Sequence, residues 1–180
     1  MSSSTYEQLW RDSRSIAGGL QRLGIAAGDR VALMLPTGKD YFHAFFGVLL
    51  TGAVPVPLYP PARLSQIEDH VRRHTGILRN AGAVVLITMN EMRRVAALLL
   101  AHAPTLRRIA TNEQLRAQHT VPLTATSSAA STALLQYTSG STGQPKGVAL
   151  SHANIIANIS ALGSALKVTG ARCTSGCRSS

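Results

Sequence analysis

The sequence predicts an α/β fold in which a mostly parallel sheet is flanked by helices. Short, continuously apolar runs such as 30–35 and 83–87 alternate with longer segments whose apolar residues recur at helical intervals. Continuous apolar runs suit strands that are buried on both faces. The β-α-β-α order therefore predicts a sheet covered on both sides, with ligands beyond the carboxyl ends of its strands. The spacing leaves the strand order open.

Helices are predicted before and after the first strand. Residues 5–8 have the spacing of a capping box, and apolar residues recur at helical intervals from there until Gly24. Residues 37–40 repeat the capping spacing before the segment 41–51. Because that segment is apolar almost all round, we expect its helix to be deeply buried.

The next segments predict an edge strand and a third helix. Residues 53–58 are strand-like, but two prolines remove backbone donors, which favours an edge position. Ser65 is expected to cap a helix that ends near Asn80. Acid-first i,i+4 ion pairs are expected on this helix, namely Glu68 with Arg72 and Asp69 with Arg73.

The alternation of predicted strands and helices continues to residue 110 and then stops. After the strand at 83–87, residues 88–91 predict another capping box and residues 92–102 another helix. A short strand is expected at 106–110. Residues 111–131 are polar and weakly patterned, so they predict a surface connection between two parts of the chain.

The last patterned unit is a hairpin followed by a helix. Strand-like runs at 133–137 and 147–150 enclose a glycine-rich segment. Ser151 is expected to cap a helix over 152–166. The apolar residues of this helix are expected to face inward, and they are Ile155, Ile156, Ile159, Leu162 and Leu166.

Composition and charge argue against several classes of protein. With 45% hydrophobic and 14% charged residues over 180 positions, the chain is expected to be globular. It has neither a membrane-length apolar run nor signal-peptide features, which predicts a cytoplasmic protein without a transmembrane segment. The net charge of +10 is compatible with nucleic-acid binding. However, the arginines are dispersed, only 4% of the residues are aromatic and no nucleic-acid-binding motif is present, which favours a basic surface that binds an acidic partner region.

Neither candidate metal cluster has enough ligands. His70 and His74 lie four residues apart on the third predicted helix, but no third ligand is in view. Cys173 and Cys177 lack a second pair. We therefore expect no metal site built from these residues.

The segment 137–148, YTSGSTGQPKGV, has the composition of a phosphate-binding loop. Glycines let backbone N–H groups approach an anion, hydroxyls add donors, and Lys146 supplies a compact charge. Pro145 before the lysine and Gly147 after it separate this loop from the common nucleotide loop that opens a helix. A flexible hairpin loop is the alternative, and the lysine and proline between two strands favour phosphate binding.

The longer string YTSGSTGQPKGVALSHAN resembles the signature loop of the adenylate-forming, AMP-binding superfamily. That superfamily includes acyl-CoA synthetases, fatty acyl-AMP ligases, peptide-synthetase adenylation domains and luciferases. The resemblance implies that ATP, with Mg²⁺, is held by its β- and γ-phosphates while a carboxylate attacks the α-phosphorus. The implied phosphate contacts are Thr138, Ser139, Gly140, Ser141, Thr142, Gly143 and Lys146. No catalytic residue is identified.

Within the superfamily the chain is most similar to fatty acyl-AMP ligases and long-chain acyl-CoA synthetases, and residues 52–63 and 66–80 resemble fatty acyl-AMP ligases more than ordinary acyl-CoA synthetases. This resemblance implies that a fatty acid is activated as its acyl-adenylate and passed to an acyl carrier protein or a polyketide synthase. Two alternatives stay open: a relative of the acyl-CoA synthetases, and a non-catalytic fragment or partner-binding module.

The resemblance spans residues 5–170 and implies the start of the large N-terminal domain of an adenylate-forming enzyme. Residues 171–180 diverge from the family, are rich in Arg, Ser and Cys, and are expected to form a disordered tail. In the family, later residues supply the adenine and ribose contacts, a metal-binding carboxylate and most of the acyl tunnel. The sequence therefore predicts a truncated chain without useful turnover of its own.

Overall fold

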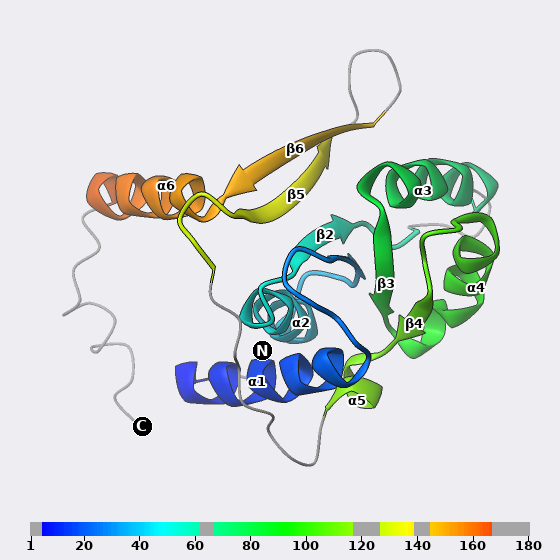
Figure 1. The fold of residues 1–180 in the computed structure, drawn as a ribbon, viewed down its shortest axis with the longest axis horizontal. Helices are drawn as coiled ribbons and strands as arrows, with labels where there is room; N and C mark the ends of the chain where they lie inside the picture. The colour runs from blue at the N-terminus through cyan, green and yellow to red at the C-terminus, as the bar shows by residue number, and fades with distance from the viewer. Residues whose placement is uncertain (1–4, 62–66, 117–126, 139–144, 167–180) are drawn as a thin grey trace.

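The computed structural model of the chain describes residues 5–61, 67–116, 127–138 and 145–166. Its body is a parallel sheet with helices on both faces, and a hairpin with a trailing helix lies beside that body (Figure 1). No helix within these ranges is long and apolar enough to cross a membrane. In chain order the elements are α1 (Tyr6–Arg22), β1 (Arg30–Met34), α2 (Lys39–Leu50), β2 (Val54–Leu58), α3 (Ile67–Ala81), β3 (Ala83–Thr88), the 3-10 turn η2 (Asn90–Met92), α4 (Arg93–His102), β4 (Arg108–Ala110), α5 (Asn112–Leu115), β5 (Thr132–Thr138), β6 (Lys146–Ser151) and α6 (His152–Ala165).

The four strands of the body are all parallel and lie in the order β2-β1-β3-β4. Strand β1 is central, and four of its five residues are buried. All six residues of β3 are buried as well. The predicted α/β class and the predicted parallel sheet are confirmed, because the continuous apolar runs do form the strands covered on both faces.

Strand β2 lies at an edge of this sheet, as its prolines predict. The Val54 amide donates to the carbonyl of Asp29 at 2.7 Å, so this register directs alternate amides of β2 toward β1. Pro55 and Pro57 take the positions between, whose amides would point away from β1. Strand β5 lies on that open side without joining the sheet, where the prolines offer no donors (Figure 1).

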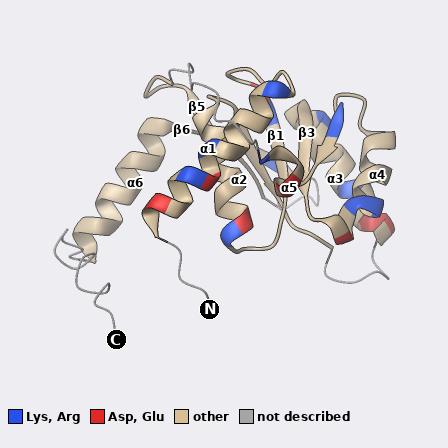
Figure 2. Ribbon diagram, turned by 90° about the horizontal axis from the view of Figure 1, so that it is seen from below, with Lys and Arg blue, Asp and Glu red and all other residues tan. Residues whose placement is uncertain are grey.

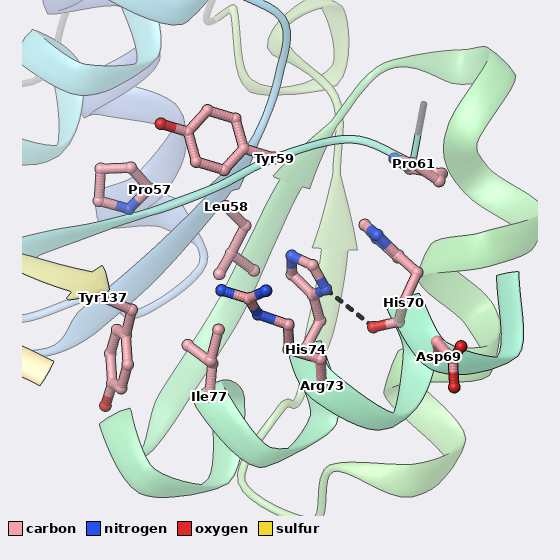
Figure 3. A pocket seen from close by; sticks show the side chains of 10 residues that line it. All are labelled: Pro57, Leu58, Tyr59, Pro61, Asp69, His70, Arg73, His74, Ile77 and Tyr137. Carbon is pink, nitrogen blue, oxygen red and sulfur yellow. Dashed lines mark hydrogen bonds between the residues drawn. The ribbon is translucent and has the colours of Figure 1, made fainter. Parts of the chain in front are cut away.

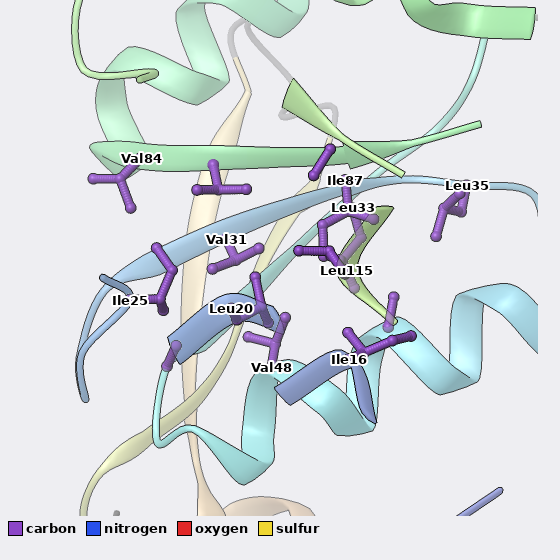
Figure 4. Close-up of a cluster of buried hydrophobic side chains, with 14 residues drawn as sticks. Ile16, Leu20, Ile25, Val31, Leu33, Leu35, Val48, Val84, Ile87 and Leu115 are labelled. Carbon is purple, nitrogen blue, oxygen red and sulfur yellow. The ribbon is translucent and has the colours of Figure 1, made fainter. Parts of the chain in front are cut away.

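Two apolar clusters fill the two faces of the parallel sheet. Alternate residues of β1 belong to opposite clusters. Val31 and Leu33 belong to the cluster under α1, α2 and α5, which Figure 4 shows. Ala32 and Met34 contact the opposite cluster, under α3 and α4. Tyr137 of β5 also belongs to that second cluster, so the hairpin is fastened to the body by a core residue.

Helix α1 approaches α5 very closely at one glycine. A Cβ added to Gly19 would overlap the backbone carbonyl of Leu115. The sequence did not predict α5, which begins in the polar segment after residue 110. Its first turn is held by a capping box between Thr111 and Gln114, with distances of 3.1 and 3.3 Å.

The predicted helix caps have mixed outcomes. The box at Thr5 forms as expected, and so does the capping by Ser151. The box predicted at 37–40 is wrong, because α2 begins after Gly38 and has no side-chain cap. The box at 88–91 is also wrong: Thr88 is the buried last residue of β3, and its hydroxyl donates to the Met34 carbonyl at 3.1 Å.

Burial differs from expectation in two helices. We expected α2 to be buried all round, but Phe42 and Phe46 on its outer side are 45% and 39% exposed. Helix α6 has no buried residue, so the inward-facing stripe predicted at 155–166 is wrong. The physical reason is that only β5 and β6 approach α6 closely among the described elements, and they leave its apolar residues uncovered.

One ion pair on α3 also differs from its prediction. Arg72 pairs with Asp69, three residues away, in place of the two expected i,i+4 pairs. The cap expected at Ser65 and the tail expected at 171–180 lie outside the described residues.

Candidate functional site

The hairpin brings together Thr138 and Lys146, the two predicted phosphate contacts that lie within the described residues. Strands β5 and β6 are antiparallel, and Thr138 lies opposite Lys146 as the last pair before the loop. Both side chains are exposed. The remaining predicted contacts lie outside the described residues, and they are Ser139, Gly140, Ser141, Thr142 and Gly143.

The neighbouring strand pair, Tyr137 and Gly147, fixes the position of this end of the hairpin. Tyr137 lies opposite Gly147, and a Cβ added to Gly147 would be 2.9 Å from Cζ of the Tyr137 ring. The ring is buried, and its hydroxyl donates to Oδ1 of Asn80 on α3. Burial raises the pKa of the Tyr137 phenol, which keeps this hydroxyl protonated as a donor at neutral pH.

A pocket of about 420 Å³ lies between α3, the carboxyl end of β2 and Tyr137 (Figure 3). Leu58 and Tyr59 come from the end of β2, while Arg73 and Ile77 come from α3. The start of the predicted loop, one residue after Tyr137, is therefore close to the carboxyl end of a sheet strand. Crevices in this position are where open α/β sheets bind ligands.

Two stacked histidines form one wall of this pocket. The rings of His70 and His74 are 3.8 Å apart, and Nδ1–H of His74 donates to the His70 carbonyl at 2.8 Å. Burial, followed by the nearby His74 and Arg73, lowers the pKa of His70 to about 4. Burial likewise lowers the pKa of His74. Both rings are thus favoured in the neutral form at pH 7.

The chemistry of the loop end suits an anion. Lys146 forms no ion pair with any residue in the described ranges, so its charge is available to a ligand. The Thr138 hydroxyl opposite adds a neutral donor. Within the same ranges, no three His, Cys, Asp or Glu side chains lie close enough to hold a metal ion.

Sequence reasoning missed how the site is supported. It read Asn80 only as a helix end, whereas this residue holds the Tyr137 hydroxyl across 57 positions of sequence. It placed Gly147 at the start of a strand-like run, and did not foresee that this glycine makes room for an aromatic ring. The available signal was a tyrosine directly before the glycine-rich loop.

The family model for AMP-binding enzymes matches residues 2–174. The chain belongs to the AMP-binding enzyme family. Its fold corresponds to the N-terminal domain of adenylate-forming enzymes, as expected from the loop, and solved members of the superfamily match most of the chain.

Curated relatives and solved structures agree on this assignment. A 4-hydroxyphenylalkanoate adenylyltransferase of Mycobacterium marinum is 36% identical over 159 residues, or 86% of this chain and 25% of that protein. The long-chain-fatty-acid–AMP ligase FadD26 of the same species is 34% identical over 162 residues, or 86% of this chain and 26% of the ligase. The structure of McyG A-PCP complexed with phenylalanyl-adenylate has a TM-score of 0.83 at 26% identity, covering 93% of this chain and 27% of that one. This chain therefore spans about a quarter of the length of these relatives.

Proposed function

We propose that this chain supplies the ATP-phosphate site of a ligase that activates a fatty acid as its acyl-adenylate. The observation that carries the proposal is the exposed pair Thr138 and Lys146 at the open end of the β5–β6 hairpin. Membership of the AMP-binding family supports ATP as the nucleotide. Similarity to FadD26 supports a fatty acid as the second substrate.

In the proposed reaction, the fatty-acid carboxylate forms a bond to the α-phosphorus while the bond from that phosphorus to the bridging oxygen breaks. Pyrophosphate leaves with the electron pair of the broken bond. Lys146 offsets the negative charge that grows on this leaving group, and the Thr138 hydroxyl orients a phosphate oxygen. Both residues act by position and charge, so neither needs to donate or accept a proton.

Mg²⁺ belongs to the proposal only as a companion of the nucleotide. The described ranges contain no cluster of three metal-ligating side chains. The residues in these ranges therefore do not fit the role of metal holder, and we assign them no step through a metal ion.

The proposed acceptor of the acyl group is a carrier protein in the cytoplasm, where ATP is available. The A-PCP arrangement of the McyG structure supports this acceptor. The relation to acyl-CoA synthetases makes coenzyme A the second candidate. Since the chain spans about a quarter of the curated relatives, we do not expect turnover from residues 1–180 by themselves.

A chimera tests the proposal, because it supplies the regions that this chain does not span. Residues 5–166 would replace the matching segment of FadD26, and fatty-acid-dependent ATP–pyrophosphate exchange would be measured. Losing a charged hydrogen bond, which contributes about 1.5–3 kcal/mol, predicts a roughly 10- to 150-fold slower exchange for Lys146→Ala.

The matched control is Arg94→Ala, which removes an exposed positive charge from α4. It should leave exchange within about twofold of the parent chimera, because surface charges away from a site have small effects. Equal exchange by the parent and the Lys146→Ala chimera would refute the phosphate role. Exchange that responds to 4-hydroxyphenyl alkanoates and not to fatty acids would refute the proposed substrate class.

A further inference from the structure

The ring of Tyr137 is held from two sides. Its hydroxyl donates to Oδ1 of Asn80, and Figure 3 shows this hydroxyl turned toward α3. On the opposite strand of the hairpin, Gly147 leaves the space that the ring fills, since a Cβ there would be 3.1 Å from the Tyr137 hydroxyl oxygen. The ring is buried and belongs to the apolar cluster under α3 and α4. Its place relative to α3 and to both hairpin strands is therefore fixed.

Both described phosphate contacts lie next to this fixed pair. Thr138 follows Tyr137, and Lys146 precedes Gly147 on the opposite strand. Successive side chains of a strand point to opposite faces, so the buried ring faces the body while Thr138 and Lys146 are exposed. A shift of the ring would therefore move both phosphate contacts with it.

The end of α3 that holds Asn80 is itself anchored to the sheet. Asn80 is the residue before the last one of α3. On the central strand β1, Nε of Arg30 donates to the Ala81 carbonyl at 2.8 Å, and its Nη2 donates to the Gly82 carbonyl at 3.1 Å. A cation that binds carbonyls at a helix C-terminus stabilises that end of the helix. Asn80 thus holds the hairpin from a fixed position in the body.

We propose that Asn80 is a positioning residue of the ATP-phosphate site, on which it acts through Tyr137. This inference rests on the proposed function. Asn80 holds the ring, and the ring keeps Thr138 and Lys146 in the placement that binds phosphate. Without the hydrogen bond, the end of the hairpin adopts other placements as well. The apparent affinity for the nucleotide then falls in proportion to the population of the binding placement.

The expected signature is a rise in the KM for ATP without a matching fall in kcat. Saturating ATP selects the binding placement, so the bound enzyme reacts as before. The net contribution of a typical hydrogen bond corresponds to a roughly 2- to 12-fold change in an equilibrium constant. A residue that only supported the general stability of the fold would not separate the two kinetic constants in this way.

The chimera with FadD26 is the parent protein for the test. Equilibrium dialysis measures the Kd of α,β-methylene-ATP, which cannot release pyrophosphate, and the exchange assay gives the KM for ATP. Asn80→Ala should raise both constants roughly 2- to 12-fold and leave kcat within about twofold. Tyr137→Phe should have the same effect. The double variant should be no worse than either single variant, because all three lack the same hydrogen bond.

Arg79→Ala is the matched control in the same turn of α3. Arg79 precedes Asn80 and is one of the exposed arginines of α3 and α4, the helices whose basic residues are blue in Figure 2. Its removal changes the local charge and keeps the Asn80 bond, so the Kd and the KM should stay within about twofold of the parent values. Circular dichroism checks the fold of each variant, and Tyr137→Phe provides the test if Asn80→Ala does not fold.

The outcomes separate this inference from the proposed function. If Lys146→Ala does not slow exchange, the proposed function fails and this inference fails with it. If Lys146→Ala slows exchange but Asn80→Ala leaves the Kd and the KM unchanged, only the positioning role is refuted. A fall in kcat at unchanged KM, an additive loss in the double variant, or an equal loss from Arg79→Ala would also overturn the positioning role.

Discussion

The hydroxyl of Tyr137 donates a hydrogen bond to Oδ1 of Asn80, and this bond joins the hairpin to α3. Tyr137 directly precedes Thr138, the first predicted phosphate contact. The bond therefore sets where the open end of the hairpin stands relative to the carboxyl end of β2. We regard it as the main polar contact that positions the candidate site.

Tyr137→Phe tests that positioning. Losing the hydrogen bond should lower the free energy of unfolding by about 0.5–1.5 kcal/mol, because the ring keeps its burial while the hydroxyl is removed. Urea unfolding measures the change. In a double-mutant cycle with Asn80→Ala, the two changes should be coupled, whereas strict additivity would mean that the bond contributes nothing.

Gly147→Ala should destabilise the hairpin. The added methyl group would be 2.9 Å from Cζ of Tyr137, and such overpacking costs about 1–3 kcal/mol. The same change made on a Tyr137→Ala background should be close to neutral, because the opposing ring is gone. An equal loss on both backgrounds, measured by urea unfolding, would rule out the ring as the cause.

Two helical glycines should respond to alanine with opposite signs. Gly19→Ala places its methyl group against the Leu115 carbonyl and should destabilise the chain by about 3 kcal/mol. Gly76→Ala in α3 meets nothing within 4 Å and should stabilise by about 0.5–1 kcal/mol, since alanine favours the helix. Thermal unfolding of both variants checks this, and a stabilising Gly19→Ala would contradict the close approach of α1 to α5.

The free energy of unfolding should decrease as the pH is lowered from about 6.5 to about 4, because of His70. Its pKa is lowered to about 4 in the folded chain, whereas an unfolded histidine titrates near about 6.5. The unfolded chain therefore binds the extra proton first as the pH falls, which draws the equilibrium toward unfolding. Below about pH 4, both states are protonated and this contribution stops changing.

The measurement for His70 is the free energy of unfolding against pH, for the wild type and for His70→Gln. The variant should lose less stability across this window, and His74, whose pKa burial also lowers, should contribute to the slope that remains. Comparing the two proteins cancels the contributions of the titratable groups that both proteins share. Parallel curves would show that His70 is not held in its neutral form.

Local sequence was a good guide where both faces of an element are apolar. The strands at 30–35 and 83–87 formed because continuous apolar runs need burial on both faces. Sequence was a poor guide to caps and to α6. Thr88 has the spacing of a cap, but its hydroxyl is already bonded to Met34 on a neighbouring strand. The stripe of α6 predicts a buried face, but no described element provides the covering surface.

The sequence by itself determined the α/β class, the edge position of the proline-containing strand and the loop that marks the AMP-binding family. Each of these depends on residue order over short distances, through periodicity, missing backbone donors and loop chemistry. Only the tertiary structure decided the strand order, the hydrogen bond between Tyr137 and Asn80 and the exposure of α6. These depend on which distant segments meet, and neither spacing nor composition specifies that.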